Sequence, residues 1–218
     1  MMNNAFYKVM NDAVLGARVL HVGCVGTRAI GANNFPLHRF LTKRARGVYG
    51  IDIDAEGIAQ MAALGFACEA TPAESYFCSE HYDVVTVSSV LQFVASPIGV
   101  ITNLARSLKP GGIMLVEVPN AYSLIEIMRN ATKFAKLKPI QLTGQSTLGE
   151  VNLFSSATLA ALIIGSGLEL ISVKSYVRKT ARDQKNLKLK IRTAINNFPR
   201  YLSPAWGPTL LATARKIV

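Results

Sequence analysis

The stretch VLHVGCVGT (Val19–Thr27) is followed at Val48–Asp54 by VYGIDID, and these two stretches decide the fold. Each begins as an apolar run suited to a buried strand; the first ends in glycines and the second in carboxylates. Glycine tolerates turns that a Cβ would forbid, so the backbone there can approach a ligand closely. A carboxylate at the end of the next strand can accept hydrogen bonds from both hydroxyls of a ribose. Together they predict an adenosine-containing ligand across the carboxyl ends of a parallel sheet.

Strand and helix patterns alternate along the rest of the chain, which indicates a doubly wound α/β sheet. We expect strands at 18–22, 48–52, 66–69, 82–88, 113–118, 169–177 and 209–217. We expect helices at 5–15, 35–46, 55–64, 98–108, 123–136 and 157–166. Ser155 or Ser156 is suited to cap the last helix, and Gly167 to end it in a left-handed turn.

Composition limits the class of protein. The 218 residues suit one domain with a sizeable core, and a hydrophobic content of 50% excludes a disordered chain. No uninterrupted apolar stretch approaches the ~20 residues of a membrane span. The first residues lack the order of a signal peptide, so we expect a cytoplasmic protein. The cysteines are three in number and have no C-x-x-C spacing, which favours neither a disulfide framework nor a metal site.

The net charge of +11 is concentrated near the end of the chain. From Lys174 onward there are 11 lysines and arginines and one acidic residue, Asp183, so the preceding body is nearly neutral. We therefore divide the chain into a core at 1–179, a basic amphipathic insertion at 180–208 and the last core strand at 209–218. Basic side chains around an apolar stripe suit a solvated face, an anionic membrane or lipid-linked substrate, or, as a weaker alternative, nucleic acid.

An ordered set of motifs resembles the class I methyltransferases that depend on S-adenosylmethionine. The set covers roughly residues 15–177 and reads VLHVGCVGT, VYGIDID, YDVVTVSSVLQFVASP, LARSLKPGG, VEVPN and VNLFSSATLAALIIGSGLEL. The resemblance implies a mostly parallel seven-stranded sheet with a reversed last strand. The four-residue turn GCVG and the VNLFS segment look most like bacterial members associated with cell-surface glycan assembly.

The same resemblance implies S-adenosyl-L-methionine as the cofactor and suggests which residues bind it. Gly23 and Gly26 would let the turn pass the methionine part and the ribose, and Asp52 would accept from the ribose hydroxyls. Leu91 would form part of the floor of the slot. The cofactor-binding residues that we expect are His21, Gly23, Cys24, Gly26, Asp52, Ile53, Glu74, Ser88 and Ser89. An alternative for the acids that end the second strand is that they cap the following helix.

The chain departs from the family pattern at four places. His21 stands where the family usually has an acidic residue, and Val25 displaces the second glycine of the turn by one position. Pro72-Ala73-Glu74 stands where an Asp-Ala-Glu is common, so Glu74 or Glu69 would have to replace the adenine-binding carboxylate. Gln92-Phe93 replaces a common Glu-His. These departures keep open a non-catalytic, methyltransferase-like binding protein.

Methyl transfer from a sulfonium is an in-line displacement, in which the protein mainly positions the reactants and excludes water. A general base helps when the acceptor is a hydroxyl. The candidates are Asn120, Tyr122 and His21, with Glu117 as a further one, and no context selects among them. His38 and His81 are expected at the surface.

The function that we expect is O-methylation of a sugar hydroxyl, on a glycan or its lipid-linked precursor, at or near the inner membrane surface. An RNA methyltransferase is the alternative enzyme, favoured by the sequence pI of about 9.8. The Pro-Pro-Tyr signature of base-amine methylation is absent after the fourth strand, where Ser88-Ser89-Val90 stands. A dinucleotide-dependent oxidoreductase is disfavoured because G-x-G-x-x-G is absent.

Overall fold

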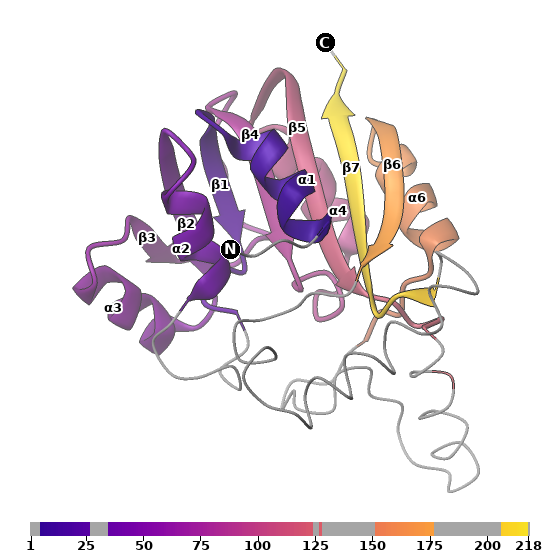
Figure 1. The fold of residues 1–218 in the computed structure, drawn as a ribbon, viewed down its shortest axis with the longest axis horizontal. Coiled ribbons are helices and arrows are strands. Elements are labelled where there is room, and N and C mark those ends of the chain that lie inside the picture. Colours follow the sequence, from indigo (N-terminus) through magenta and orange to yellow (C-terminus); the bar gives the residue numbers. More distant parts are fainter. Residues whose placement is uncertain (1–4, 27–34, 124–126, 128–150, 177–205, 218) are drawn as a thin grey trace, which may run out of the picture.

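The computed structural model describes residues 5–26, 35–123, 127, 151–176 and 206–217 (Figure 1). The helices are α1 (Ala5–Val14), α2 (Pro36–Thr42), α3 (Ala55–Ala63), α4 (Pro97–Ala105) and α6 (Ser156–Gly165). The strands are β1 (Arg18–Val22), β2 (Gly47–Asp52), β3 (Cys68–Ala70), β4 (Tyr82–Ser88), β5 (Leu108–Pro119), β6 (Leu168–Tyr176) and β7 (Thr209–Lys216). Each strand that the sequence predicts is present.

The strands form one sheet in the order β3-β2-β1-β4-β5-β7-β6. β1 pairs in parallel with β2 and β4, and the remaining neighbours up to β5 are also parallel. β7 lies between β5 and β6 and runs antiparallel to both, so the reversed last strand is confirmed. The strand order reverses direction between β1 and β4, and in such sheets ligands bind outside the carboxyl ends of the strands at this point.

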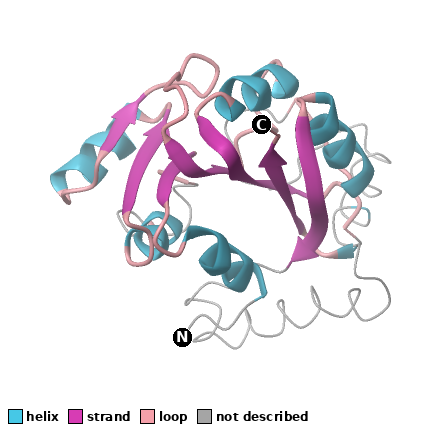
Figure 2. Ribbon diagram, turned by 90° about the horizontal axis from the view of Figure 1, so that it is seen from above, coloured by secondary structure: helices cyan, strands magenta, loops and turns pink. Residues whose placement is uncertain are grey.

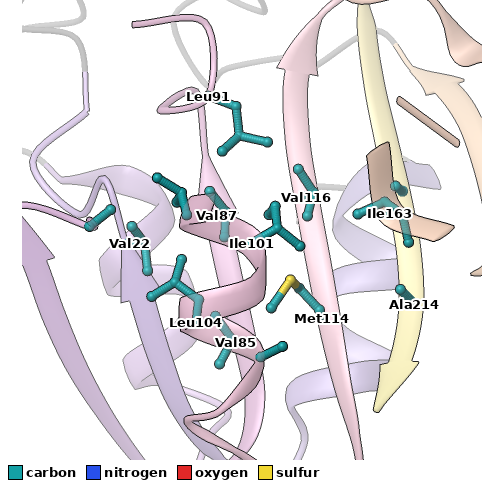
Figure 3. Close-up of a cluster of buried hydrophobic side chains, with 14 of the residues drawn as sticks. Val22, Val85, Val87, Leu91, Ile101, Leu104, Met114, Val116, Ile163 and Ala214 are labelled. Carbon is teal, nitrogen blue, oxygen red and sulfur yellow. The ribbon is translucent and has the colours of Figure 1, made fainter. Parts of the chain in front are cut away.

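Helices cover both faces of the sheet, which forms the middle layer in Figure 2. Alternate side chains of the central strands point to opposite faces. Val19 and Val84 pack with α1 and α2, whereas Leu20 and Val85 belong to the larger cluster on the side of α4 and α6. Figure 3 shows part of this larger cluster, in which the labelled residues are Val22, Val85, Val87, Leu91, Ile101, Leu104, Met114, Val116, Ile163 and Ala214.

The ends of α6 follow the local signals in the sequence. Ser155 and Thr158 form a reciprocal capping box at its start, which satisfies two backbone amides that the first turn leaves free. Gly167 follows its end with φ +80°, a left-handed conformation that glycine adopts without strain. The cap that we expected at Ser155 or Ser156 is therefore Ser155.

The helix before β5 is shorter than expected. α4 ends at Ala105, and the turn closes when the Ser107 N–H donates to the Leu104 carbonyl. Leu108 is fully buried and pairs with Tyr82, so the LKPGG sequence belongs to the start of β5. The expected helix at 35–46 likewise reduces to Pro36–Thr42.

Two expected segments fall largely outside the described residues: the helix at 123–136 and the basic insertion at 180–208. Within the described part of the chain, none of the helices has the length and apolar character needed to cross a membrane. The same residues contain no group of three or more His, Cys, Asp or Glu side chains able to hold a metal ion.

Candidate functional site

The glycine turn follows β1 at the carboxyl edge of the sheet, where the central strands end. Gly23 has φ +77°, and its N–H donates to the Ile51 carbonyl at 2.9 Å. A Cβ on Gly23 would lie 2.5 Å from the Ser88 carbonyl oxygen, so this position must be glycine for β1 and β4 to meet here. Gly26 has φ +70°, and among the described residues no heavy atom lies within 4 Å of the position of a Cβ, so its backbone borders open space there.

Val25, the extra residue of the turn, is held by two other elements. Its N–H donates to Oδ2 of Asp52 at 3.0 Å. Its side chain lies against Gly57 in the first turn of α3, where any Cβ would collide with it. The longer turn is therefore docked onto the acid that ends β2 and onto α3.

Asp52 lies at the carboxyl end of β2 and is partly buried. Its two carboxylate oxygens accept the N–H groups of Val25 at 3.0 Å and Asp54 at 3.1 Å. Burial raises the pKa of Asp52, and these two backbone hydrogen bonds oppose the rise. A carboxylate accepts about four hydrogen bonds, so both oxygens keep capacity for ribose hydroxyls.

Asp54 fills the capping role that the sequence left open for this pair of acids. Its Oδ1 accepts the Gly57 N–H at 3.1 Å, which places it at the N-cap of α3. Ile53, between the two acids, is 62% exposed and presents an apolar surface beside Asp52. The division of roles leaves Asp52 as the acid suited to a ligand.

The prediction that His38 lies at the surface is wrong. His38 and His21 are each 1% exposed, and their Nδ1 atoms are 3.1 Å apart, so one ring donates to the other. Gly50 of β2 has no Cβ, and one there would lie 2.8 Å from Sγ of Cys24 and 3.1 Å from Cε1 of His38, so Cys24 and His38 share the space that this glycine leaves. The edge of its ring also contacts Phe66, with the ring centroids 4.9 Å apart.

Burial, with a smaller contribution from the neighbouring Arg39, lowers the pKa of His38 to about 4. His38 is therefore neutral at neutral pH, and its ring is hydrogen-bonded to that of His21. His21 occupies the position of the family's acidic residue, but it is enclosed with His38 between β1, β2 and α2. By contrast, His81 is exposed, as expected, and contacts Arg18 at the opposite end of the sheet.

The two serines predicted to contact the cofactor lie at the carboxyl end of β4: Ser88 is its last residue and Ser89 follows it. Ser88 is 7% exposed, and within the described residues its Oγ has no hydrogen-bond partner. Ser89 has φ +53°, a conformation that is uncommon outside glycine, and its N–H donates to the Glu117 carbonyl at 2.9 Å. Such unsatisfied and strained groups concentrate at ligand sites.

Asn120, one of the candidate bases, is buried rather than open to an acceptor. It is 1% exposed, its Nδ2 donates to the Gly207 carbonyl at 2.7 Å, and its Oδ1 accepts the Tyr122 N–H at 3.1 Å. Its amide therefore joins the chain after β5 to the chain before β7. Among the other base candidates, Glu117 is also buried, whereas Tyr122 is 63% exposed.

The acids considered for the adenine side lie in different surroundings. Glu74 is exposed, and its backbone is held by the Asn103 side chain. Glu69 hydrogen-bonds Tyr49; burial, together with Glu69, raises the pKa of Tyr49 to about 12. Glu74 is thus the freer of the two carboxylates. Cys24 is buried in a cluster with Ile58 and Met61, so its side chain faces the protein.

Sequence reasoning missed the contributions of His38 and Val25. Gly50 is the signal that points to His38, since a glycine inside an apolar strand marks close approach of another group. Gly57 is the corresponding signal for Val25, because it stands in the first turn of a helix that begins after the acidic pair.

The residues present fit S-adenosyl-L-methionine at this edge of the sheet. Gly26 leaves open space beside the turn, Asp52 offers acceptors for ribose, and the Ser88 hydroxyl lacks a partner within the described structure. When bound, this cofactor supplies a methyl group on a sulfonium.

Comparison with known proteins agrees with this assignment. Residues 13–173 match the family described as Methyltransferase domain. A curated relative, the ubiquinone biosynthesis O-methyltransferase of Burkholderia ambifaria strain MC40-6, is 28% identical over 177 residues, which cover 76% of this chain and 74% of the relative.

Two solved structures share the fold. One is an S-adenosylmethionine-dependent methyltransferase from Mesorhizobium loti, with 16% identity, a TM-score of 0.64 and coverage of 97% of this chain and 96% of that one. Another, from Thermotoga maritima, is described as a possible histamine N-methyltransferase and has 16% identity, a TM-score of 0.64 and coverage of 96% and 87%. This chain belongs to the methyltransferase family and is an S-adenosyl-L-methionine-dependent methyltransferase.

Proposed function

We propose that this enzyme methylates a hydroxyl oxygen of an acceptor that has a large apolar part. The observation that supports the proposal most directly is a group of exposed apolar side chains around the carboxyl edge, which we call the apolar rim. The apolar rim consists of Tyr122, Ile127, Val151, Leu153 and Trp206. Exposed apolar side chains that gather at one edge of a protein are typical of binding sites for apolar ligands or partners.

Hydrogen bonds between the surrounding segments bring the apolar rim together. The Ala121 N–H donates to the Phe154 carbonyl at 2.9 Å, and the Asn120 N–H donates to the Pro208 carbonyl at 2.9 Å. The segments that contain the rim therefore meet beside the end of β5. This is the same edge of the sheet at which Asp52 and the glycine turn lie, and an acceptor must reach this edge to meet the methyl group.

Two classes of acceptor fit these requirements. The sequence resemblance suggests a sugar hydroxyl on a lipid-linked glycan, whereas the name of the Burkholderia ambifaria relative suggests an oxygen acceptor in ubiquinone biosynthesis. Both combine a hydroxyl with an apolar part. In either case the residues of this chain act mainly by positioning the reactants and excluding water.

Methyl transfer from radiolabelled S-adenosylmethionine tests the acceptor class. Lipid-linked sugars and hydroxyl-bearing rings with a lipid chain are compared with the same head groups lacking the lipid chain. We expect KM to be lower for the acceptor with the chain, and we expect Leu153→Ser to remove that difference. Ile164→Ser, which changes an exposed isoleucine of α6, is the matched control. Equal KM values with and without the lipid chain would refute the proposal.

The basic insertion supports a second, related proposal: the segment 180–208 contacts an anionic membrane surface. Each lysine or arginine near such a surface contributes about 1 kcal/mol, and salt screens the contribution. We expect the protein to sediment with vesicles that contain phosphatidylglycerol, but not with vesicles of phosphatidylcholine alone. Binding of bulk RNA with a steep dependence on salt, in the absence of vesicle binding, would favour the RNA alternative instead.

A further inference from the structure

The chain that follows β4 forms a short loop, residues 89–95, which we call the post-β4 loop. The Ser89 N–H donates to the Glu117 carbonyl, and the Phe93 N–H donates to the Val90 carbonyl at 2.9 Å, which closes a turn. Leu91 is fully buried, and Figure 3 shows it at the end of the core cluster near Val87. The post-β4 loop is therefore anchored to the core through its apolar side chain.

Three backbone carbonyls of the post-β4 loop are bound by Val151 and Asn152. Nδ2 of Asn152 donates to the Leu91 carbonyl at 3.1 Å and to the Val94 carbonyl at 2.7 Å. The backbone N–H groups of Val151 and Asn152 both donate to the Gln92 carbonyl, at 2.8 and 3.2 Å. Four hydrogen bonds from two consecutive residues thus fix three carbonyls of one loop.

The post-β4 loop also contacts the glycine turn directly. A Cβ on Gly23 would lie 2.5 Å from the Ser88 carbonyl oxygen and 2.7 Å from Cγ2 of Val90. The Ser88 carbonyl and Val90 therefore pack directly against the backbone of the glycine turn. The glycine turn and the post-β4 loop, which both border the cofactor edge, therefore pack against each other. Asn152 binds the carbonyls of the loop.

We propose that Asn152 is a positioning residue for methyl transfer: its amide holds the post-β4 loop against the glycine turn and so sets the affinity for S-adenosyl ligands. The inference rests on the cofactor assignment and is independent of the acceptor proposed above. It assigns a role to the asparagine of the VNLFS segment through two carbonyls that lie 61 and 58 residues earlier in the chain.

The chemistry of the contact requires an asparagine. An amide nitrogen has two N–H donors, and both are used by the two carbonyls. An aspartate of the same shape has only acceptors when ionised, so it would face two carbonyl oxygens without a donor. Protonation of that aspartate would restore one donor, so the defect of Asn152→Asp should diminish as pH falls.

The test compares affinity for S-adenosylhomocysteine, measured by calorimetry, with thermal stability. We expect Asn152→Ala to raise Kd by about ten-fold or more, because carbonyls that lose their donors release the loop. Ser155→Ala is the matched control: it removes the N-cap of α6 only three residues away and leaves the four hydrogen bonds of the loop intact. It should lower the melting temperature while leaving Kd within about two-fold.

The variant Asn152→Asp adds a readout that a loss of stability alone does not move. Relative to the wild type at the same pH, its Kd should improve between about pH 8 and pH 5, whereas the ratio for Ser155→Ala should stay constant. Equal changes in Kd for Asn152→Ala and Ser155→Ala would overturn the positioning role. Failure of the wild type to bind S-adenosylhomocysteine would instead overturn the cofactor assignment, and the inference with it.

Discussion

Replacement of Asp52 by alanine tests the cofactor site most directly. In the free protein each carboxylate oxygen of Asp52 accepts one backbone N–H, from Val25 and from Asp54. Two ribose hydroxyls would add two hydrogen bonds to a charged acceptor in a partly buried place. Loss of these bonds is expected to cost about 1–3 kcal/mol, which corresponds to a rise in Kd of about 5- to 150-fold.

The measurement is calorimetric titration with S-adenosylhomocysteine, with a melting curve for each variant. Asp52→Ala also releases the Val25 N–H, so a loss of stability must be separated from a loss of contacts to the ligand. Asp54→Ala provides this control, since it removes the cap of α3 at a cost of about 1 kcal/mol, or roughly 2–4 °C in Tm. Unchanged affinity in Asp52→Ala would refute the ribose role.

Two further predictions concern the turn and the histidine pair. Gly26→Ala should lower Tm modestly, through backbone strain alone. Gly23→Ala should lower Tm much more, because its Cβ also meets the Ser88 carbonyl. Equal decreases in Tm for the two variants would contradict this packing. Burial holds the pKa of His38 near 4, below about 6.5 in the unfolded chain. The unfolded chain therefore binds more protons between these values, and stability should fall as pH drops from about 6.5 to 4. His38→Asn should flatten this dependence of Tm on pH, and an unchanged curve would show that other groups cause it.

The sheet was predictable from the sequence because its signals are local. The apolar run of β4, the glycine after β1 and the serine cap of α6 each depend on neighbours within a few positions. The errors arose where a long-range contact decides the outcome. Leu108 belongs to β5 rather than to a helix because it pairs with Tyr82, a residue far away in the sequence.

The distinction between local signals and long-range contacts also explains which residues of the candidate site were predicted correctly. Asp52 was identified from its place after a strand, and its position at the carboxyl edge agrees with the prediction. The burial of His38 depends on a space that Gly50 leaves in a different element, and the amide of Asn120 is bound by Gly207. One sequence cannot show that His38 packs against Gly50 or that Asn120 binds Gly207. Many polar residues follow strands, and the spacing of residues along the chain does not reveal which distant residues they contact.

The departures from the family pattern look different once these contacts are included. His21 replaces an acid, but it is paired with a second buried histidine, His38, which packs together with Cys24 against Gly50. Val25 lengthens the glycine turn, but its N–H binds Asp52 and its side chain fits against Gly57. Both departures are thus accommodated by contacts with other elements of the described structure. Replacement of Gly50 or Gly57 by alanine should therefore disturb the cofactor edge, although both glycines belong to a strand and a helix outside the turn itself.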